Sequence, residues 1–302
     1  MNIIGKKYWY FLFSLIIIVP GVISLLLWGL NLSIDFSGGS RLTLAFNNQV
    51  SSKQVSTLRT VFEQNKIKVQ TVEVSNKTVF VRSTQVDEKK DIVVINEIKS
   101  KIGNVEQQSY ETVGPTIGAE TTANAVKAII IASILIVLYI TWSFRSVPKP
   151  TSSFRFGVCA VIALIHDVLV LIGIFSLLGH FFNIEVDSLF VTAVLTVIGF
   201  SVHDTIVVFD RIRENLKRLG GNDFNLVVNE SILQTLDRSL NTSMTVILVL
   251  VALLFFGGES IRWFVLALLI GIVSGTYSSI FNASPLLVLW QEILQKRKSS
   301  SK

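Results

Sequence analysis

Long apolar runs dominate this chain, and most charged residues lie in the segments between them. An uninterrupted apolar run of about 17–25 residues is long enough to cross a bilayer as a helix. The first run, at about 10–30, is too long for the core of a signal peptide and lacks a small-residue cleavage pattern, so we expect a retained helix. Five more runs predict five further transmembrane helices, at about 126–144, 156–179, 187–209, 242–257 and 263–290.

The segment 31–125 has no such run, and its charges are nearly balanced, as expected of a water-facing domain. Its alternating and helical patterns predict strand 41–46, helix 51–65, strands 66–74 and 77–82, helix 87–103 and strand 105–113. This β-α-β-β-α-β order is the split ferredoxin-like pattern. The predicted fold class is therefore an α-helical integral membrane protein with six transmembrane helices and one α+β extracytoplasmic domain between helices 1 and 2.

Basic residues gather in four clusters that fall on one side of the membrane if the chain crosses it six times. The clusters are Lys6 and Lys7; Arg145, Lys149 and Arg155; Arg211, Arg213, Lys217, Arg218 and Arg238; and Lys296, Arg297 and Lys298. Because such residues favour the cytoplasmic side, we expect both termini in the cytoplasm and the chain in the cytoplasmic, or inner, membrane. The expected order is an N-terminus with the first helix (1–30), an extracytoplasmic domain (31–125), a five-helix bundle (126–290) and a basic tail (291–302).

The composition adds exclusions to this picture. Half of the 302 residues are apolar and 16% are charged, with 27 basic against 21 acidic residues and a formal net charge of +6. The topology accounts for the basic excess, so it gives no reason to expect a nucleic-acid partner. The single cysteine, Cys159, lies inside an apolar run, which excludes a disulfide framework and a cysteine-based metal site.

The fourth predicted helix contains an acidic residue, Asp204, in the sequence GFSVHDTIVVFDRIREN. An ionised carboxyl in hydrocarbon costs at least about 2.5–3.5 kcal/mol, so Asp204 should face other helices or a water-filled cavity. Since burial disfavours the charged form, such a group is a candidate for exchanging a proton between two conformations. Alternatively, Asp204 only hydrogen-bonds neighbouring hydroxyls such as Ser201 and Thr205 and holds the bundle together.

The third helix has a second polar point, His166 and Asp167, in ALIHDV. If the hairpin 156–209 is antiparallel, this pair approaches His203 and Asp204. The histidines and aspartates could in principle bind a metal, yet no dense ligand spacing such as H-E-x-x-H is present. We therefore expect neither a metal nor a cofactor, and a buried histidine paired with a polar neighbour is the alternative.

Three other features have more than one interpretation. The bases of DRIREN (210–215) lie where a helix would enter the cytoplasm, and topology explains at least part of them. Arg238, near the start of the fifth span, either pairs with a buried carboxylate or extends to the membrane interface. Small residues from Gly271 to Ser279 permit close helix packing, within this chain or against a partner.

Four motifs occur in a specific order: DFSGG at 35–39, VGPTIG at 113–118, ALIHDV at 163–168 and GFSVHDTIVVFDRIREN at 199–215. With them the chain resembles the SecF family, the smaller membrane partner of SecD in the bacterial Sec protein-export machinery, whose helices belong to the resistance-nodulation-division superfamily. The resemblance covers nearly the whole chain. The residues that match family motifs are Asp35, Phe36, Gly38, Gly39, Gly114, Pro115, Gly199, Asp210, Arg211 and Arg213.

The resemblance implies a non-enzymatic auxiliary subunit that, with SecD, uses the proton motive force in late steps of protein export. Implied partners are SecD, the SecYEG channel, YajC/YidC-type subunits, the exported polypeptide and the lipid bilayer. The family's proposed proton pathway falls on Asp204 and Arg238, with His203, His166 and Asp167 as further relay candidates. The chain departs from the family at His203, where asparagine is frequent, and an added imidazole would change the pH range of any coupling.

Three other functions remain as alternatives. The chain could be a scaffold that holds SecD and the channel together without proton coupling. It could be a small-solute or lipid exporter of the same superfamily, although such transporters usually have about twice as many helices and two outer domains. An intramembrane hydrolase is the weakest alternative, because no nucleophile-base pair is recognisable.

Overall fold

The structure is a computed structural model that describes residues 1–145, 147–148, 151–218 and 223–300. The chain divides into two compact units, Met1–Asn31 with Lys127–Lys302, called here the membrane unit, and Leu32–Val126, called the α+β unit. Lys149 of the second basic cluster and the last two residues of the expected tail lie outside the described residues.

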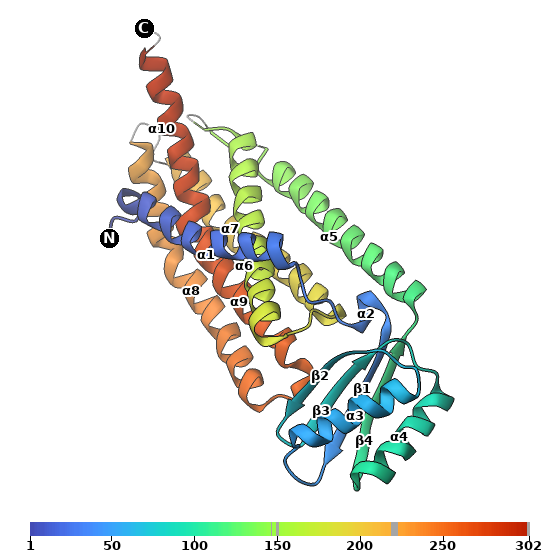
Figure 1. Ribbon diagram of the computed structural model, residues 1–302. Helices are drawn as coiled ribbons and strands as arrows, with labels where there is room; N and C mark the ends of the chain where they lie inside the picture. The colour runs from blue at the N-terminus through green and yellow to red at the C-terminus, as the bar shows by residue number, and fades with distance from the viewer. Residues whose placement is uncertain (146, 149–150, 219–222, 301–302) are drawn as a thin grey trace. The chain divides into compact units, whose positions relative to one another are not determined.

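Across these described ranges, six helices are long and apolar enough to cross a membrane, which confirms this part of the predicted fold class. The first combines a 3-10 turn, η1 (Ile4–Lys6), with α1 (Lys7–Trp28). The next four are α5 (Pro115–Ser143), α6 (Ser153–Phe182), α7 (Ser188–Arg218) and α8 (Phe224–Phe256). After a 3-10 turn, η2 (Glu259–Ile261), the sixth comprises α9 (Arg262–Ser278), a π-helical segment, η3 (Ser279–Ala283), and α10 (Ser284–Ser300) (Figure 1).

Several helices extend beyond the apolar runs that predicted them. α5 begins at Pro115 rather than near 126, and α8 begins at Phe224 rather than near 242. The early turns of α8 bury residues at helical spacing, including Val228 and Ile232, so one packed face stabilises them outside the apolar run. α10 likewise continues to Ser300, where a tail was expected from 291. An apolar run thus marks the part of a helix suited to hydrocarbon and not its ends.

The α+β unit has the predicted β-α-β-β-α-β order. Its elements are β1 (Gly39–Phe46), α3 (Ser52–Gln64), β2 (Val69–Ser75), β3 (Thr78–Ser83), α4 (Glu88–Ile102) and β4 (Val105–Val113). The four strands form an antiparallel sheet in the order β2-β3-β1-β4. The core contains inward residues of the sheet and the buried faces of α3 and α4, among them Leu42, Val81, Leu58 and Ile98.

A short helix, α2 (Ile34–Ser37), precedes β1 and was not predicted. Ser33 caps it by accepting a hydrogen bond from the backbone N–H of Asp35. Its end is followed by Gly38 and Gly39, which have φ angles of 69° and 124°, conformations that favour glycine. The DFSGG motif is therefore a capped turn of helix that leads directly into β1, one of the two inner strands of the sheet.

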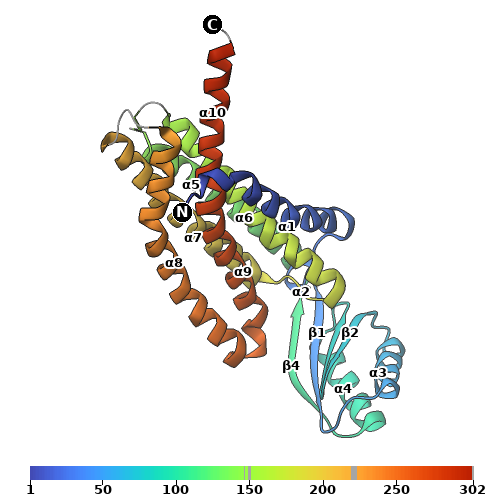
Figure 2. The same cartoon turned by 90° about the vertical axis from the view of Figure 1, so that its left-hand side faces the viewer.

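In the membrane unit, α9 packs against α6, α7 and α8 (Figure 2). Its contact with α7 is close because Gly271 lies against Val197 and Gly275 lies against Ser201. A Cβ atom added at Gly271 would be 2.1 Å from Cγ2 of Val197. The small-residue face of the last helix is therefore used for packing within this chain.

Candidate functional site

Asp167 of α6 lies in the centre of the membrane unit with none of its surface exposed. Its Oδ2 accepts hydrogen bonds from Ser201 of α7 at 2.5 Å and from Ser278 of α9 at 2.6 Å. Its Oδ1 accepts one from Ser274 of α9 at 2.8 Å and lies 2.9 Å from Nδ1 of His166. One carboxyl group therefore joins three helices through four polar contacts.

Asp204 of α7 is also buried, with 2% of its surface exposed, but it accepts fewer hydrogen bonds, from Ser243 of α8 and Thr276 of α9. The Ser243 hydroxyl of α8 donates to its Oδ2 at 3.4 Å, and the same hydroxyl lies 2.6 Å from the hydroxyl of Thr276 on α9. Asp204 thus has acceptor capacity left over, whereas the oxygens of Asp167 are occupied by donors. A change of protonation at Asp204 therefore disturbs fewer hydrogen bonds than one at Asp167.

The two hydroxyls that the sequence offered as partners of Asp204 point elsewhere. Ser201 donates to Asp167, and Thr205 donates to the backbone carbonyl of Ser201 at 3.1 Å. The Thr205 hydroxyl also lies 2.8 Å from that of Ser279, which donates to the Ser201 carbonyl at 3.2 Å. These hydroxyls therefore join α7 to Asp167 of α6 and to Ser279 after α9, and they belong to the same buried region.

We call this buried region the polar seam. It consists of Asp167, Ser201, Asp204, Thr205, Ser243, Ser274, Thr276, Ser278 and Ser279, all with less than a tenth of their surface exposed. The sequence singled out the acids but not the hydroxyls of α8 and α9 as their partners. The signal was present as serines one helical turn apart in an apolar span, at Ser274 and Ser278.

The remaining relay candidates do not all join the seam. His166 is mostly buried beside Asp167, with its ring centroid 6.4 Å from that of Tyr277, and its Nε2 has no hydrogen-bond partner within the described part of the chain. His203 and Arg238 have exposed side chains. Between the described residues Arg238 and Asp204 there is no ion pair. The structure brings together His166, Asp167 and Asp204, and leaves His203 and Arg238 on the surface of the unit.

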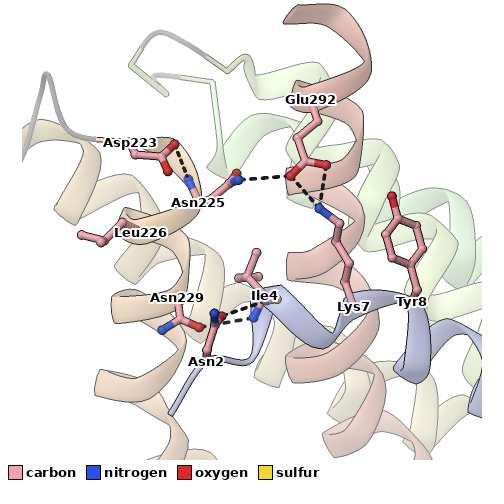
Figure 3. A pocket seen from close by; sticks show the side chains of 10 residues that line it. Asn2, Ile4, Lys7, Tyr8, Asp223, Asn225, Leu226, Asn229 and Glu292 are labelled. Carbon is pink, nitrogen blue, oxygen red and sulfur yellow. Dashed lines mark hydrogen bonds and ion pairs between the residues drawn. The ribbon is translucent and has the colours of Figure 1, made fainter. Parts of the chain in front are cut away.

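No group of three or more His, Cys, Asp and Glu side chains suited to a metal ion occurs within the described residues. A cavity of about 520 Å³ lies away from the seam, between the start of α1, the start of α8 and α10 (Figure 3). Within it Lys7 pairs with Glu292 at 2.5 Å, Asn225 donates to Glu292 at 3.1 Å, and Asn229 accepts from the N–H of Ile3 at 2.8 Å. These groups satisfy one another, so they fasten the N-terminus to α8 and α10.

The family-motif residues of α7 beyond the seam form contacts near its end. Asp210 pairs with Arg213 at 2.5 Å, and Arg213 donates to the carbonyl of Ser143 at 3.3 Å. Arg211 pairs with Glu214 at 2.6 Å. Gly199 has open space around its α-carbon. Both ion pairs lie within α7, and exposed pairs of this kind contribute little to stability. Of these contacts, the one from Arg213 to Ser143 links α7 to the end of α5.

In the α+β unit, the DFSGG and VGPTIG motifs pack against each other. Thr122 donates to the carbonyl of Phe36 at 3.3 Å, and a Cβ atom at Gly118 would lie 2.9 Å from both the Phe36 oxygen and the Gly38 nitrogen. Pro115 packs on Gly38. The two ends of the unit are therefore fastened together, backbone against backbone.

Two family models match the chain over these motifs. The model described as SecD/SecF GG Motif matches residues 23–50, and the model described as Protein export membrane protein SecD/SecF, C-terminal, matches residues 93–293. The chain belongs to the SecD/SecF family. The resemblance drawn from its motifs is confirmed.

Relatives within the SecD/SecF family extend over almost the whole chain. A Protein translocase subunit SecF from Thermobaculum terrenum is 50% identical over 301 residues, covering 96% of this chain and 94% of the relative. Another from Anaerolinea thermophila is 45% identical over 293 residues, with the same two coverages of 96% and 94%.

Other SecD/SecF relatives are longer. The Protein translocase subunit SecDF of Bacillus subtilis is 35% identical, and the match covers 98% of this chain but 39% of that protein. The crystal structure of SecDF from Thermus thermophilus, described as a translocon-associated membrane protein, matches with a TM-score of 0.82 and 34% identity. That match covers 97% of this chain and 39% of the longer one.

Proposed function

We propose that this chain is an auxiliary subunit of the bacterial Sec translocase that, together with a SecD-type partner, uses the proton motive force in late steps of protein export. The proposal places the chain in the cytoplasmic membrane with both termini in the cytoplasm and the α+β unit outside. The observation that carries the coupling is the buried Asp204, which has fewer hydrogen-bond donors, Ser243 and Thr276, than Asp167 has. An intramembrane carboxyl of this kind is a functional group by default.

In this mechanism Asp204 takes a proton in one conformation and releases it in another. Protonation removes a charge from the seam, which changes the cost of bringing α7, α8 and α9 together. A charge that crosses the full potential supplies about 2.3 kcal/mol per 100 mV, so a few protons suffice for a movement of modest free energy. Asp167, held by four contacts, fixes α6 against α7 and α9 while Asp204 cycles.

The exposed His203 and Arg238 support a partner at this surface. Polar groups of a membrane helix are costly against lipid and usually face protein or a water-filled cavity. Fusion of both subunits in the Bacillus subtilis relative agrees with a SecD-type partner there. The SecYEG channel, YajC/YidC-type subunits and the exported polypeptide belong to the same proposal and rest on membership of the family.

The test replaces Asp204 by Asn, which keeps the shape and removes the titration. Export of a secreted reporter is measured in cells depleted of their own copy, with abundance and co-purification of the partner as controls. We expect export to fall to the depleted level while abundance and partner binding stay normal. Asp237→Asn is the matched control, because Asp237 of α8 is exposed and belongs to none of the family motifs. Normal export by the Asp204 variant would exclude the relay.

A scaffold without proton coupling is the second candidate. The hydrogen-bond network around Asp167 favours it, because that network joins three helices without any need for titration. A scaffold would keep full export with Asn at position 204 but would lose it when the α7–α9 contact is disrupted at Gly271. The relatives' names give no support to a small-solute exporter or a hydrolase.

A further inference from the structure

α9 contacts both carboxyl sites of the polar seam from different sides. Ser274 and Ser278 are four residues apart, so they lie on one face, and both donate to Asp167. Thr276 lies between them in sequence and is rotated by about 200° around the helix axis, at 3.6 residues per turn. Its hydroxyl pairs with Ser243, the donor to Asp204. α9 therefore lies between the two acids.

The segment that follows the C-terminal end of α9 is not a regular α-helix. The five residues of η3, Ser279–Ala283, form a π-helical segment directly after the seam hydroxyls. Pro285 follows it and has no backbone N–H to donate to the carbonyl of Phe281, which explains why the regular pattern is interrupted here. π-helical turns inside α-helices are rare and occur frequently at functional sites.

The segment after α9 begins with the seam residue Ser279 and also has contacts outside the seam. Asn282 and Ser14 of α1 exchange contacts at 2.8 and 3.1 Å, and Ser284 donates to the carbonyl of Ser279 at 3.4 Å. The π-helical segment thus lies between α10 and the part of α9 that contacts the two acids, and it bonds α7 through Ser279 and α1 through Asn282.

We propose that α9 couples the two acids by rotating about its axis on the π-helical segment, with Ser274, Thr276 and Ser278 as positioning residues. Rotation of α9 that brings Thr276 closer to Asp204 moves Ser274 and Ser278 away from Asp167, and the reverse rotation restores them. Proton exchange at Asp204 is then transmitted to the α6–α7–α9 junction. This inference rests on the proposed proton exchange at Asp204.

The groups that face the two acids are few. Around Asp167 they are the hydroxyls of Ser201, Ser274 and Ser278 and the ring of His166, with Tyr277 of α9 beside that ring. Around Asp204 they are the hydroxyls of Ser243 and Thr276 and, on its own helix, the neighbouring His203. No lysine or arginine among the described residues is hydrogen-bonded to either acid. A change in the donors of α9 therefore acts on the acids directly.

The first experiment replaces Pro285 by Ala, which restores the missing N–H and favours a continuous α-helix. Pro20→Ala is the matched control, since Pro20 also lies inside a membrane helix, α1, but on its exposed side. The reporter's export is measured against external pH. We expect the Pro285 variant to shift the pH profile by about one unit, whereas loss of packing alone would lower export equally at every pH.

A second measurement follows α9 without using export. Spin labels are placed at the exposed Ile162 of α6 and Val273 of α9, in the full chain with Cys159→Ala. The distance between the two labels is measured in lipid with and without Asp204→Asn. We expect the Asp204 change to shift the distance by about 1–2 Å, the usual scale of helix shifts in switching proteins. Pro285→Ala should abolish that shift.

The outcomes separate the two hypotheses. An unchanged distance with Asn at position 204, or a shift that persists with Ala at position 285, overturns the α9 coupling. Normal export with Asn at position 204 overturns the proton-exchange function even if α9 moves. If the Pro285 variant fails to fold, Ser274→Ala with Ser278→Ala replaces it in both measurements and must shift the pH profile. An unchanged profile for that double variant also overturns the inference.

Discussion

Asp167 and Ser201 are joined by a 2.5 Å hydrogen bond across the α6–α7 contact, and Ser201 lies one helical turn before Asp204. This single donor connects the heavily bonded acid to the helix that carries the sparsely bonded one. Any movement of α7 that follows a change at Asp204 therefore acts first on the hydrogen bonds of Asp167.

Replacement of Ser201 by Ala should cost about 1 kcal/mol of stability, the typical net value of one intramolecular hydrogen bond. The sharper measurement is a double-mutant cycle of thermal stability in detergent with Asp167→Asn, in which we expect a coupling energy of at least about 0.5 kcal/mol. Thr196→Val is the control, because Thr196 is an exposed hydroxyl of the same helix that bonds only the carbonyl of Thr192. Additive effects of Ser201→Ala and Asp167→Asn would contradict this bond.

Replacement of Gly271 by Ala tests the close contact of α7 and α9. The new Cβ would lie 2.1 Å from Cγ2 of Val197, so the helices must separate, at a cost of about 1–3 kcal/mol for overpacking. Gly199→Ala is the control on α7, where the added atom meets nothing within 4 Å. Val197→Ala should rescue the Gly271 variant, as measured by its melting temperature. Failure of this rescue would mean that the contact is not where the structure has it.

Replacement of Gly118 by Ala should weaken the packing between the DFSGG and VGPTIG motifs. The added Cβ would meet the backbone of Phe36 and Gly38 at 2.9 Å, and backbone atoms cannot move aside as a flexible side chain does. We expect faster hydrogen exchange in residues 33–39. Gly114→Ala is the control, because its nearest new neighbour is a side-chain atom 3.9 Å away. Equal exchange in both variants would argue against this packing.

The sequence predicted the membrane helices and the burial of Asp204 because both follow from local properties: run length and the cost of a charge in hydrocarbon. It did not predict that His203 faces outward while its neighbour Asp204 faces inward. Adjacent residues of a helix point in directions about 100° apart, and the apolar pattern did not define which face of the helix is buried. The donors of α9 were also missed, because their contacts join helices distant in sequence. Pro285, inside the last predicted span, is a readable signal for an irregular helix.

The α+β unit provides a pH-dependent prediction outside the membrane. Asp91 of α4 is 5% exposed; Gln107 donates to its Oδ2 at 2.8 Å, and its Oδ1 has no hydrogen-bond partner within the described part of the chain. Burial raises the pKa of Asp91 above its ordinary value, the hydrogen bond from Gln107 opposes that rise, and the charge of Glu88 adds to it. The folded unit therefore binds this proton more tightly than the unfolded chain does.

At neutral pH the buried charge of Asp91 lowers the stability of the unit, and protonation on acidification should remove this destabilisation. Stability should rise as the pH falls through the raised pKa towards the ordinary aspartate value of about 3.9, below which the contribution is constant. Asp91→Asn should give the higher stability already at neutral pH and remove this part of the pH dependence. Asp87→Asn is the control, because Asp87 is exposed just before the same helix and its side chain forms no capping bond. The measurement is the hydrogen-exchange protection of the α4 amides in the full chain, corrected for the intrinsic effect of pH on exchange. If protection falls on acidification in the unmodified chain but not in the Asp91 variant, the predicted sign is wrong.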